Sequence, residues 1–349
     1  MNFQSFDSLK IASPTNIKIC SVGSHLPEEV VKSDDIFAEF NSSSEYDIAT
    51  DWMSQEMGIE ERRVSPQGTL PSQLAIPAAQ SAIDKLDGLS PDLIDMVIFC
   101  GIERDQSEPA TAHTIQQALG LHADHAFDVS NACFGFMHGI EIATNYIKSG
   151  SVRLAMIVTG EVPSRVLREA VRKLKRGMSK AEAQDIIGAL SVGDAGGAVI
   201  LGPSAPDEAE GFRIFNTKTD SSHAKKCYYR VNEKGGINGL MKMGPIVGAS
   251  IWMHRKIIGD TLGMLGWDKF DWLCMHQTGK RPFEKFSELS TVEDNNIIKT
   301  YNTLGNVASA TFPINFEMLL NSGKVERGDR IGGIHSGSGL VVGEFGYQM

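Results

Sequence analysis

The chain has 349 residues, of which 42% are hydrophobic and 22% are charged, and its formal charge at neutral pH is −10. This composition is typical of an ordinary globular protein, and the length allows two domains or one large duplicated domain. The negative charge argues against non-specific binding to nucleic acid, which needs a basic surface. No apolar run approaches the length of a membrane span, so we expect no integral membrane segment.

Five cysteines lie far apart along the chain, and no two of them form a CxxC pair. Their odd number, their spacing and the lack of a signal-peptide pattern at the polar N-terminus predict reduced thiols, a cytoplasmic location and no zinc site. We expect residues 1–15, which are polar and show no period, to form a loose lead-in.

Strand-like and helix-like patterns alternate from residue 17 onward. The first half has strand patterns near 17–26, 95–101, 126–132, 154–161 and 196–202, and helical patterns over 71–87, 110–119 and 134–149. The second half has helical patterns over 247–264 and 311–321, and strand patterns near 271–277, 329–337 and 339–346. This alternation predicts an α/β fold with buried, largely parallel strands.

Three pairs of similar segments indicate that the two halves are copies of one unit. They are SPDLIDMVIFC (90–100) with GWDKFDWLCMH (266–276), NACFGF (131–136) with NVASAT (306–311), and GGAVILG (196–202) with SGLVVGE (338–344). Each match is weak, but all three occur in the same order, which favours a duplication. We place the boundary in the polar segment 203–211, so that the halves are 1–203 and 204–349.

The segment 164–190 interrupts the alternation with a helical pattern. Within it, six basic residues lie close together: Arg165, Arg168, Arg172, Lys173, Lys175 and Arg176. Such a helix is either an ordinary solvated surface or a landing patch for a phosphate-bearing or acidic partner, and the sequence leaves both interpretations open.

Cys133 is the first candidate for a reactive group. It follows the strand pattern of 126–132 and precedes the helical pattern of 134–149, so we expect it at a helix N-terminus. Free backbone N–H groups and the positive end of the helix dipole stabilise a thiolate there. The alternative is a buried structural cysteine, because free cysteines are among the most buried residues.

His276 and Asn306 complete a possible site with Cys133. His276 ends the apolar segment 271–275, and Asn306 lies in a glycine-containing turn. Polar residues at the ends of buried strands are where α/β folds place their sites, and these three supply a nucleophile and two hydrogen-bond donors for an oxyanion or enolate. Papain-like proteases also carry Cys, His and Asn in this order, but their cysteine lies near the mature N-terminus in a different motif.

Five segments together resemble thiolase-superfamily condensing enzymes of the β-ketoacyl-acyl-carrier-protein synthase III type: FDVSNACFGF (127–136), GDAGGAVIL (193–201), DWLCMHQ (271–277), LGNVASATFP (304–313) and GSGL (337–340). The resemblance covers almost the whole chain. It implies a duplicated thiolase fold in five layers, αβαβα, and a homodimer. It also implies an acyltransferase that uses coenzyme A or a carrier protein as the acyl carrier and needs no metal or other cofactor.

The resemblance also implies roles for individual residues. Cys133 would accept the acyl group, and His276 and Asn306 would hold the carbonyl of the second thioester. The backbone N–H groups of Cys133 and Ser338 would form the oxyanion hole. The segment TDWMSQEMGIEERR (50–63) resembles the part of the family that binds the adenine of coenzyme A. The thioester-binding candidates are therefore Trp52, Arg62 and Arg281.

The histidine motif continues as Gln-Thr-Gly, whereas enzymes of this type that start fatty-acid synthesis usually continue it as Gln-Ala-Asn. The loop GIERDQSEPATAH (101–113), which carries Glu108, and the helical insertion after TGE (159–161) resemble a branch that condenses two acyl thioesters head to head, such as the olefin-pathway condensing enzyme and pyrone-forming ketosynthases. In that branch a glutamate matching Glu108 reaches from the neighbouring subunit and removes the α-proton. A simple acyl thioester needs such a base, whereas a malonyl donor forms its carbanion by losing carbon dioxide.

We therefore expect an acyltransferase that joins two acyl thioesters by Claisen condensation to a β-keto product, in lipid or secondary-metabolite biosynthesis. The first alternative is a decarboxylative synthase III with a malonyl donor. The second is an inactive subunit that scaffolds an active partner, and the intact Cys133, His276 and Asn306 argue against it. By position alone, Glu108 could equally be a surface carboxylate ahead of a helix.

Overall fold

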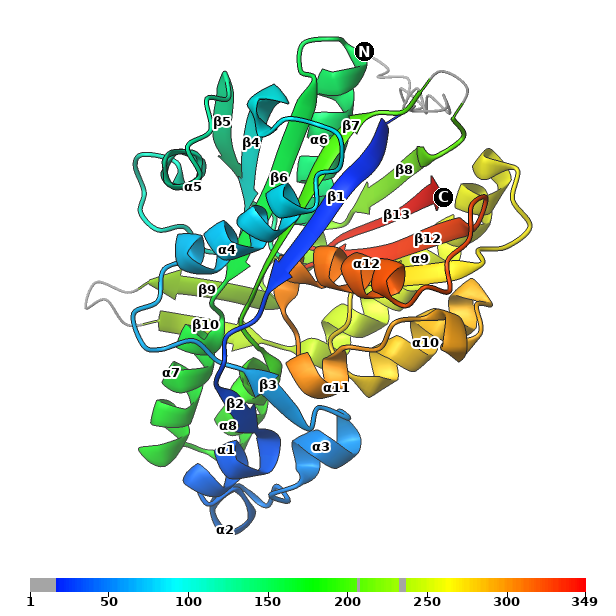
Figure 1. Cartoon of the computed structure of the whole chain (residues 1–349). Coiled ribbons are helices and arrows are strands. Elements are labelled where there is room, and N and C mark those ends of the chain that lie inside the picture. The colour runs from blue at the N-terminus through cyan, green and yellow to red at the C-terminus, as the bar shows by residue number, and fades with distance from the viewer. Residues whose placement is uncertain (1–16, 206–207, 232–236) are drawn as a thin grey trace, which may run out of the picture.

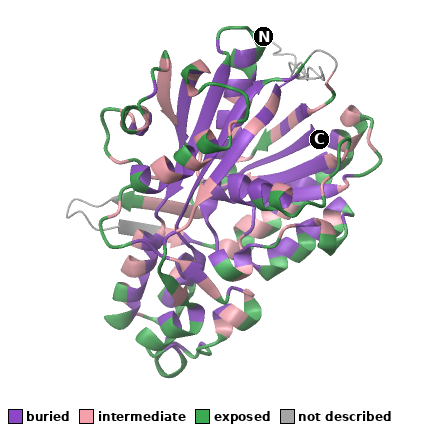
Figure 2. Ribbon diagram, in the orientation of Figure 1, coloured by how far each residue is buried: buried purple, intermediate pink, exposed green. Residues whose placement is uncertain are grey.

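The structure is a computed structural model and describes residues 17–205, 208–231 and 237–349. The expected lead-in over 1–15 lies outside these described residues. Two main β-sheets form the centre of the molecule, with helices between them and on their outer faces (Figure 1). Figure 2 shows that most strands of both sheets are buried, so the core is built around the sheets.

The first sheet contains β1 (Ile17–His25), β4 (Ile94–Cys100), β5 (His125–Val129), β6 (Leu154–Glu161) and β7 (Ala195–Pro203). Their order across the sheet is β1-β7-β6-β4-β5. β4 is parallel to β5 and β6, whereas β7 is antiparallel to β6 and to β1.

The second sheet contains β8 (Gly211–Thr219), β11 (Trp272–Met275), β12 (Arg330–Gly337) and β13 (Val341–Gln348), in the order β8-β13-β12-β11. β11 is parallel to β12, and β13 is antiparallel to β12 and β8. A parallel bridge from Leu273 to Ile297 takes the place that β5 has in the first sheet. The two sheets therefore repeat one order and one set of directions, as the three pairs of similar segments predicted.

The segment 203–211 joins the two sheets, because β7 ends at Pro203 and β8 begins at Gly211. We keep 1–203 and 204–349 as the proposed halves. The expectation of largely parallel strands is only partly right. β4, β5 and β6 run parallel, as do β11 and β12, but β7 and β13 each run antiparallel to both of their neighbours. A strand that is buried on both faces is apolar along its length whether it runs parallel or antiparallel to its neighbours. The apolar pattern therefore predicts that the strand is buried but not its direction.

Helices complete five layers in the expected order αβαβα. α4 (Pro71–Asp84) and α5 (Thr111–Ala118) cover the first sheet, while α9 (Met243–Leu265) packs on the second sheet and α10 (Lys280–Ser290) packs on α9. α6 (Gly135–Lys148) and α12 (Thr311–Asn321) lie between the sheets. There Phe136 and Phe312 are in contact, with ring centroids 6.0 Å apart.

Smaller elements gather at one end of the sheets (Figure 1). They are β2 (Val30–Lys32), α1 (Ser33–Glu39), α2 (Ser42–Tyr46), α3 (Trp52–Glu56), β3 (Glu61–Arg63), α7 (Ser164–Lys175), α8 (Lys180–Ile186), β9 (Cys227–Val231), β10 (Ile237–Met241) and α11 (Tyr301–Leu304). Five short 3-10 helices connect elements: Pro91–Leu93, Ile187–Ser191, Ser221–His223, Asp294–Asn296 and Ala308–Ala310. In the part of the chain that the structure describes, no helix is both long and apolar enough to cross a membrane.

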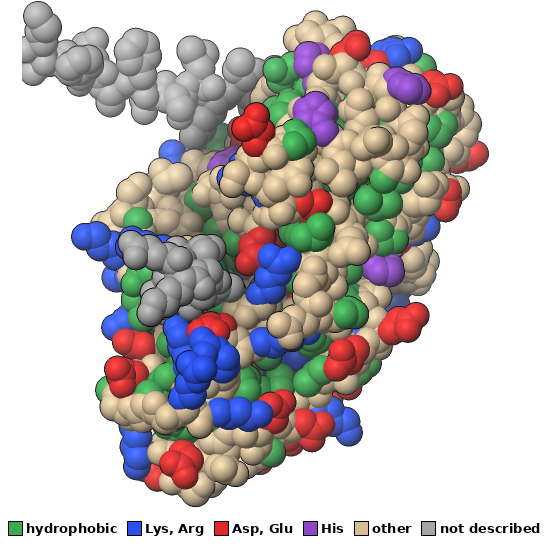
Figure 3. All heavy atoms as spheres, turned by 90° about the vertical axis from the view of Figure 1, so that its left-hand side faces the viewer, with side chains coloured by type: hydrophobic (Ala, Val, Ile, Leu, Met, Phe, Trp, Pro, Cys, Tyr) green, Lys and Arg blue, Asp and Glu red, His purple; other side chains and the backbone are tan. Residues whose placement is uncertain are grey.

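The predicted helical segment 164–190 is two helices, α7 and α8, because the chain breaks at 176–179 before the Ser179 side chain caps α8. Five of its six basic residues form ion pairs or hydrogen bonds within the chain, among them Arg165 with Glu103 at 3.0 Å and Lys175 with Glu39 at 2.6 Å. Figure 3 shows basic side chains beside acidic ones on this side of the molecule. These pairs favour the ordinary surface over the landing patch.

Candidate active site

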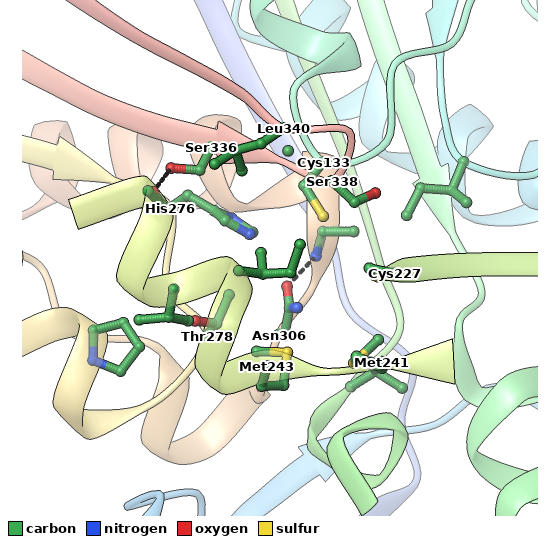
Figure 4. Close-up of a pocket in the computed structure, with 18 of the residues that line it drawn as sticks. Cys133, Cys227, Met241, Met243, His276, Thr278, Asn306, Ser336, Ser338 and Leu340 are labelled. Atoms are coloured by element: carbon green, nitrogen blue, oxygen red, sulfur yellow. Dashed lines mark hydrogen bonds between the residues drawn. The ribbon is translucent and has the colours of Figure 1, made fainter. Parts of the chain in front are cut away.

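An apolar cavity of about 810 Å³, including its open mouth, lies where the two halves meet. Cys133, His276, Asn306 and Ser338 all line it (Figure 4). They come from the segment before α6, the end of β11, the turn before α12 and the loop between β12 and β13. The fold thus brings together four predicted residues that are up to 205 positions apart in the chain.

The walls of the cavity are mostly apolar. They are formed by Ile102, Val192, Cys227, Tyr229, Met241, Met243, Ile246, Val247, Phe286 and Leu340. Many of these come from the β9–β10 hairpin and the first turns of α9, and no pattern in the sequence predicted that these elements lie at a site. A lining of this kind fits an alkyl chain, while the few polar groups fix the orientation of a ligand.

Asn306 is held by its backbone. Its N–H donates to the carbonyl of Ser191 at 2.8 Å, and its own carbonyl accepts from the N–H of Gly193 at 3.1 Å. The side-chain oxygen accepts a hydrogen bond from the N–H of Ala308 at 3.0 Å (Figure 4). Because Oδ1 is used in this way, the amide NH₂ is left to donate to a ligand in the cavity.

His276 is a neutral imidazole with one side anchored. Burial lowers its pKa to about 4. Its Nδ1 lies 3.3 Å from the hydroxyl of Thr311, which is also 2.8 Å from the carbonyl of Ala308. The hydroxyl can accept from Nδ1–H while it donates to that carbonyl, or donate to a bare Nδ1. Both tautomers therefore find a partner, and Nε2 can act as acceptor or donor.

Cys133 lies just before α6, as predicted, after Ala132 with a φ of +48°. The predicted resting thiolate is wrong, however. Burial raises the pKa of the Cys133 thiol, and nearby Glu161 and Cys227 raise it further. In an apolar cavity the loss of hydration outweighs the stabilisation by the helix end, so the thiol rests neutral and needs a proton acceptor when it reacts.

Glu161 is a buried carboxyl that the sequence analysis missed. It ends β6, accepts a hydrogen bond from the Ser309 hydroxyl, and lies 3.3 Å from the N–H of Ile102. Burial raises its pKa to about 8. The sequence contained a signal for Glu161, because it is a polar residue at the end of the strand pattern 154–161. The same criterion identified His276.

Glu108 does not reach the cavity of its own chain. It is exposed in the loop between β4 and α5 and is not among the residues that line the cavity. A role next to Cys133 therefore requires a second subunit, as the resemblance implied.

The three thioester-binding candidates differ in their surroundings. Trp52 is half-buried on α3, with its ring centroid 6.2 Å from that of Phe37. Arg281 is exposed in the first turn of α10 and forms an ion pair with Glu56 of α3 at 2.8 Å. Its neighbour Pro282 lines the cavity, so Arg281 lies close to the rim.

Arg62 is fully buried, and its assignment as a thioester-binding residue is wrong. Its guanidinium donates to the Ser33 hydroxyl and the Leu190 carbonyl, both at 2.9 Å, and burial lowers its pKa to about 10. The side chains of β3 alternate between two faces, and that of Arg62 points inward. It holds structural elements together instead of facing a ligand.

Among the described residues, no group of three or more His, Cys, Asp or Glu side chains could hold a metal ion.

Comparisons with known proteins agree with this arrangement. Residues 127–222 match the model of the 3-oxoacyl-[acyl-carrier-protein] synthase III family, and residues 264–347 match the model of its C-terminal part. These two segments together make up just over half of the chain. They contain Cys133 in the first segment and His276, Asn306 and Ser338 in the second.

Two curated relatives carry the name β-ketoacyl-[acyl-carrier-protein] synthase III. The protein from a Bradyrhizobium species is 27% identical over 93% of this chain and 98% of its own length. The protein from Neisseria meningitidis is 28% identical over 90% of this chain and 93% of its own length.

Solved structures of Xanthomonas campestris OleA share the fold. One with bound lauric acid and lauroyl-CoA has a TM-score of 0.88 and 23% identity, and covers 96% of this chain and 99% of that one. One with bound cerulenin has a TM-score of 0.89, also at 23% identity, and covers 97% of this chain and 99% of that one. The chain therefore belongs to the 3-oxoacyl-[acyl-carrier-protein] synthase III family, and it is a condensing acyltransferase with the duplicated thiolase fold.

Proposed function

We propose that the protein condenses two acyl thioesters head to head, without decarboxylation, through an acyl group on Cys133. The observation that carries this proposal is the convergence of Cys133, His276, Asn306 and Ser338 on one apolar cavity. Such a cavity holds an alkyl chain beside a nucleophile and hydrogen-bond donors.

In the first step, the Cys133 sulfur attacks the carbonyl carbon of an acyl thioester. The thiol proton passes to Nε2 of His276, which is neutral because burial lowers its pKa to about 4. The backbone N–H groups of Cys133 and Ser338 stabilise the oxyanion. The carbon–sulfur bond to the carrier then breaks, and the proton moves from His276 to the departing thiolate.

In the second step, a carboxylate removes the α-proton of another acyl thioester. His276 and Asn306 donate hydrogen bonds to its enolate oxygen, and the α-carbon attacks the acyl carbon on Cys133. The bond to the Cys133 sulfur breaks, which releases a β-keto thioester. The Cys133 thiolate then takes up a proton from water and the carboxylate gives its proton to water, so both groups return to their starting state. We assign the base to Glu108 of the neighbouring subunit in a homodimer, because Glu108 is exposed and absent from the cavity lining of its own chain.

The acyl groups are fatty acyl chains on coenzyme A or on an acyl carrier protein. The apolar lining supports a long alkyl chain, and the OleA structure with lauric acid and lauroyl-CoA supports a fatty acyl thioester. Trp52 and Arg281 lie on neighbouring elements near the rim and remain candidates for contact with the carrier. No cofactor beyond the carrier takes part in this scheme.

The second candidate is decarboxylative condensation with a malonyl donor, which the names of the curated relatives favour. The two reactions differ in what they need. Head-to-head condensation runs on one saturated acyl-CoA alone, whereas the alternative requires a malonyl thioester.

The test supplies lauroyl-CoA alone and measures the acyl group on Cys133 and the β-keto product by mass spectrometry. We expect both species in the wild type. Asn306→Ala should still take up the acyl group normally but form product about a hundredfold more slowly, because it removes a donor to the enolate. His276→Ala should slow both the uptake of the acyl group and the formation of product, because it removes the proton acceptor for the Cys133 thiol as well as a donor to the enolate. If product appears only when malonyl-CoA is present, the head-to-head proposal is contradicted and the decarboxylative reaction is supported.

A further inference from the structure

A second set of polar side chains reaches the same cavity from α9, β12 and β13. Nδ1 of His254 lies 3.1 Å from Oε1 of Glu344, and its Nε2 lies 3.1 Å from the hydroxyl oxygen of Ser336. The side chains of His254 and Glu344 are completely buried, whereas Ser336 is partly exposed and lines the cavity. The hydroxyls of Ser336 and Ser250 are 2.6 Å apart, a hydrogen bond drawn as a dashed line in Figure 4.

The direction of these hydrogen bonds follows from the groups themselves. Oε1 of Glu344 is the acceptor for Nδ1–H, so Glu344 fixes the proton of His254 on Nδ1. Nε2 is then an acceptor, and the hydroxyl of Ser336 donates to it. Ser250 in turn donates to the Ser336 oxygen. Acid, imidazole and hydroxyl are thus connected in the order of a serine hydrolase triad.

Packing alone does not explain this set of residues. Burying charged and polar groups costs free energy unless every one of them is paired, and apolar side chains of similar size would fill the space at lower cost. Among the described residues, the second oxygen of Glu344 has no hydrogen-bond partner. The polar chain nevertheless ends in a hydroxyl on the wall of a cavity made for an acyl chain.

We propose that Ser336 is a second nucleophile in this cavity, activated by His254 and oriented through Glu344, and that it hydrolyses thioesters of apolar acyl chains. This activity goes beyond the condensation and needs neither Cys133 nor Glu108. Its substrate class follows from the shared apolar walls, which hold the same alkyl chain in both reactions.

The reaction is balanced with water as the only co-reactant. The Ser336 oxygen attacks the thioester carbonyl, and its proton moves to Nε2 of His254. The carbon–sulfur bond breaks, and His254 returns the proton to the departing thiolate, which leaves an acyl ester on Ser336. His254 then takes a proton from water, the hydroxide attacks the ester, and the proton returns to the Ser336 oxygen as the acid is released.

The experiment starts from Cys133→Ala, which removes the first nucleophile. This variant is treated with an alkyl fluorophosphonate, a reagent for activated serines, and the modified residue is identified by peptide mass spectrometry. Hydrolysis of lauroyl-CoA is followed in parallel by the release of the coenzyme A thiol. We expect the label on Ser336 and measurable hydrolysis that obeys saturation kinetics.

Additional substitutions in the Cys133→Ala background separate catalysis from packing. Ser336→Ala should abolish the label and reduce hydrolysis by about a hundredfold or more, and Glu344→Gln should do the same because it no longer fixes the tautomer of His254. Ser290→Ala removes a buried hydroxyl that lies outside the cavity and serves as the matched control. It should leave both readouts unchanged.

The outcome also distinguishes this inference from the proposed condensation. Ser336→Ala with an intact Cys133 should still carry an acyl group on Cys133, so a defect confined to hydrolysis supports a separate role for Ser336. The inference is overturned if Cys133→Ala takes up no label on Ser336, or if hydrolysis is equal in Cys133→Ala and in Cys133→Ala with Ser336→Ala.

Discussion

The reactivity of Cys133 depends on its burial and its neighbours more than on its helix. The sequence placed it correctly before α6, but the raised pKa comes from burial and from Glu161 and Cys227, which belong to other elements. Spacing along the chain cannot report such neighbours. For the same reason the sequence could not show that Arg62 points inward, since an adjacent arginine in a three-residue strand lies on the other face.

Replacing Glu161 by Gln should make Cys133 more acidic. Above about pH 8 Glu161 is ionised, and its negative charge opposes a thiolate on Cys133. Without that charge we expect roughly tenfold more thiolate at a given alkaline pH, a shift of about one pKa unit. The rate of alkylation by iodoacetamide across pH 7 to 11 measures the shift.

The matched control for this shift is Glu141→Gln on α6. Glu141 is a half-buried carboxyl whose pKa burial also raises, but it is not among the groups that shift the pKa of Cys133. Equal alkylation profiles for wild type, Glu161→Gln and Glu141→Gln would show that Glu161 does not control the thiol.

At the scale of elements, the β9–β10 hairpin separates the active-site cavity from a second one. Tyr229 and Met241 line both cavities, and the Tyr229 hydroxyl lies 3.8 Å from the Met241 sulfur. The second cavity, of about 310 Å³, is bounded mainly by apolar residues of α7, α8 and β10, together with Glu169 and Lys173 of α7. Tyr229 and Met241 therefore form the end wall of the first cavity.

Met241→Ala should extend the acyl chains that Cys133 accepts. The shorter side chain joins the two cavities, and each further methylene that enters an apolar space contributes a factor of about four in binding. A mixture of acyl-CoA esters of different chain lengths, followed by intact-mass analysis of acylated protein, measures the preference. Met178→Ala is the control, because it removes the same kind of side chain from a position outside both cavities. This variant should not change the preference for chain length. An unchanged preference in Met241→Ala would place the end of the chain elsewhere.

The longer elements were predictable because their periods are strong. The main strands except β8, and the helices α4, α5, α6, α9 and α12, lie within the predicted segments or overlap them. β8, the short elements between residues 30 and 63, the hairpin and α10 were missed. The elements between 30 and 63 have only three to seven residues, too few for a clear period, and the hairpin gains its stability from packing. The second polar set was missed because Glu344 and His254 look like ordinary residues of a strand and a helix until the fold joins them.

For the whole molecule, duplication explains where the site lies. α6 and α12 occupy equivalent places between the sheets, Cys133 precedes one and Asn306 precedes the other. The two central helices therefore present their N-terminal ends, and the residues before them, to one cavity. Three weak internal matches were enough to predict this relation, because they fell on equivalent strands and turns.

The stability of the whole molecule should fall as the pH drops from about 6.5 to about 4. His276 has an ordinary pKa of 6.5 and a folded pKa of about 4, so in this window the unfolded chain binds a proton that the folded chain does not. Proton binding then favours unfolding, by up to about 3 kcal/mol for this residue. Urea denaturation at pH 7, 5.5 and 4.5 measures it.

The control for this effect is His276→Gln, which removes the titrating group but retains the carboxylates that also respond to acid. Its free energy of unfolding should decline less steeply between pH 6.5 and pH 4 than that of the wild type. Parallel declines would mean that His276 does not remain neutral in the folded protein.

The central claim is that one condensing site combines Cys133 of one chain with Glu108 of its partner. Cys133→Ala and Glu108→Ala are each expected to be inactive with lauroyl-CoA alone, although Glu108→Ala should still accept the acyl group. The direct measurement mixes the two variants under subunit exchange, confirms heterodimers by native mass spectrometry, and records β-keto product. We predict that activity returns, because one site of the heterodimer contains both wild-type residues. Heterodimers without product, or full activity of Glu108→Ala by itself, would contradict the account.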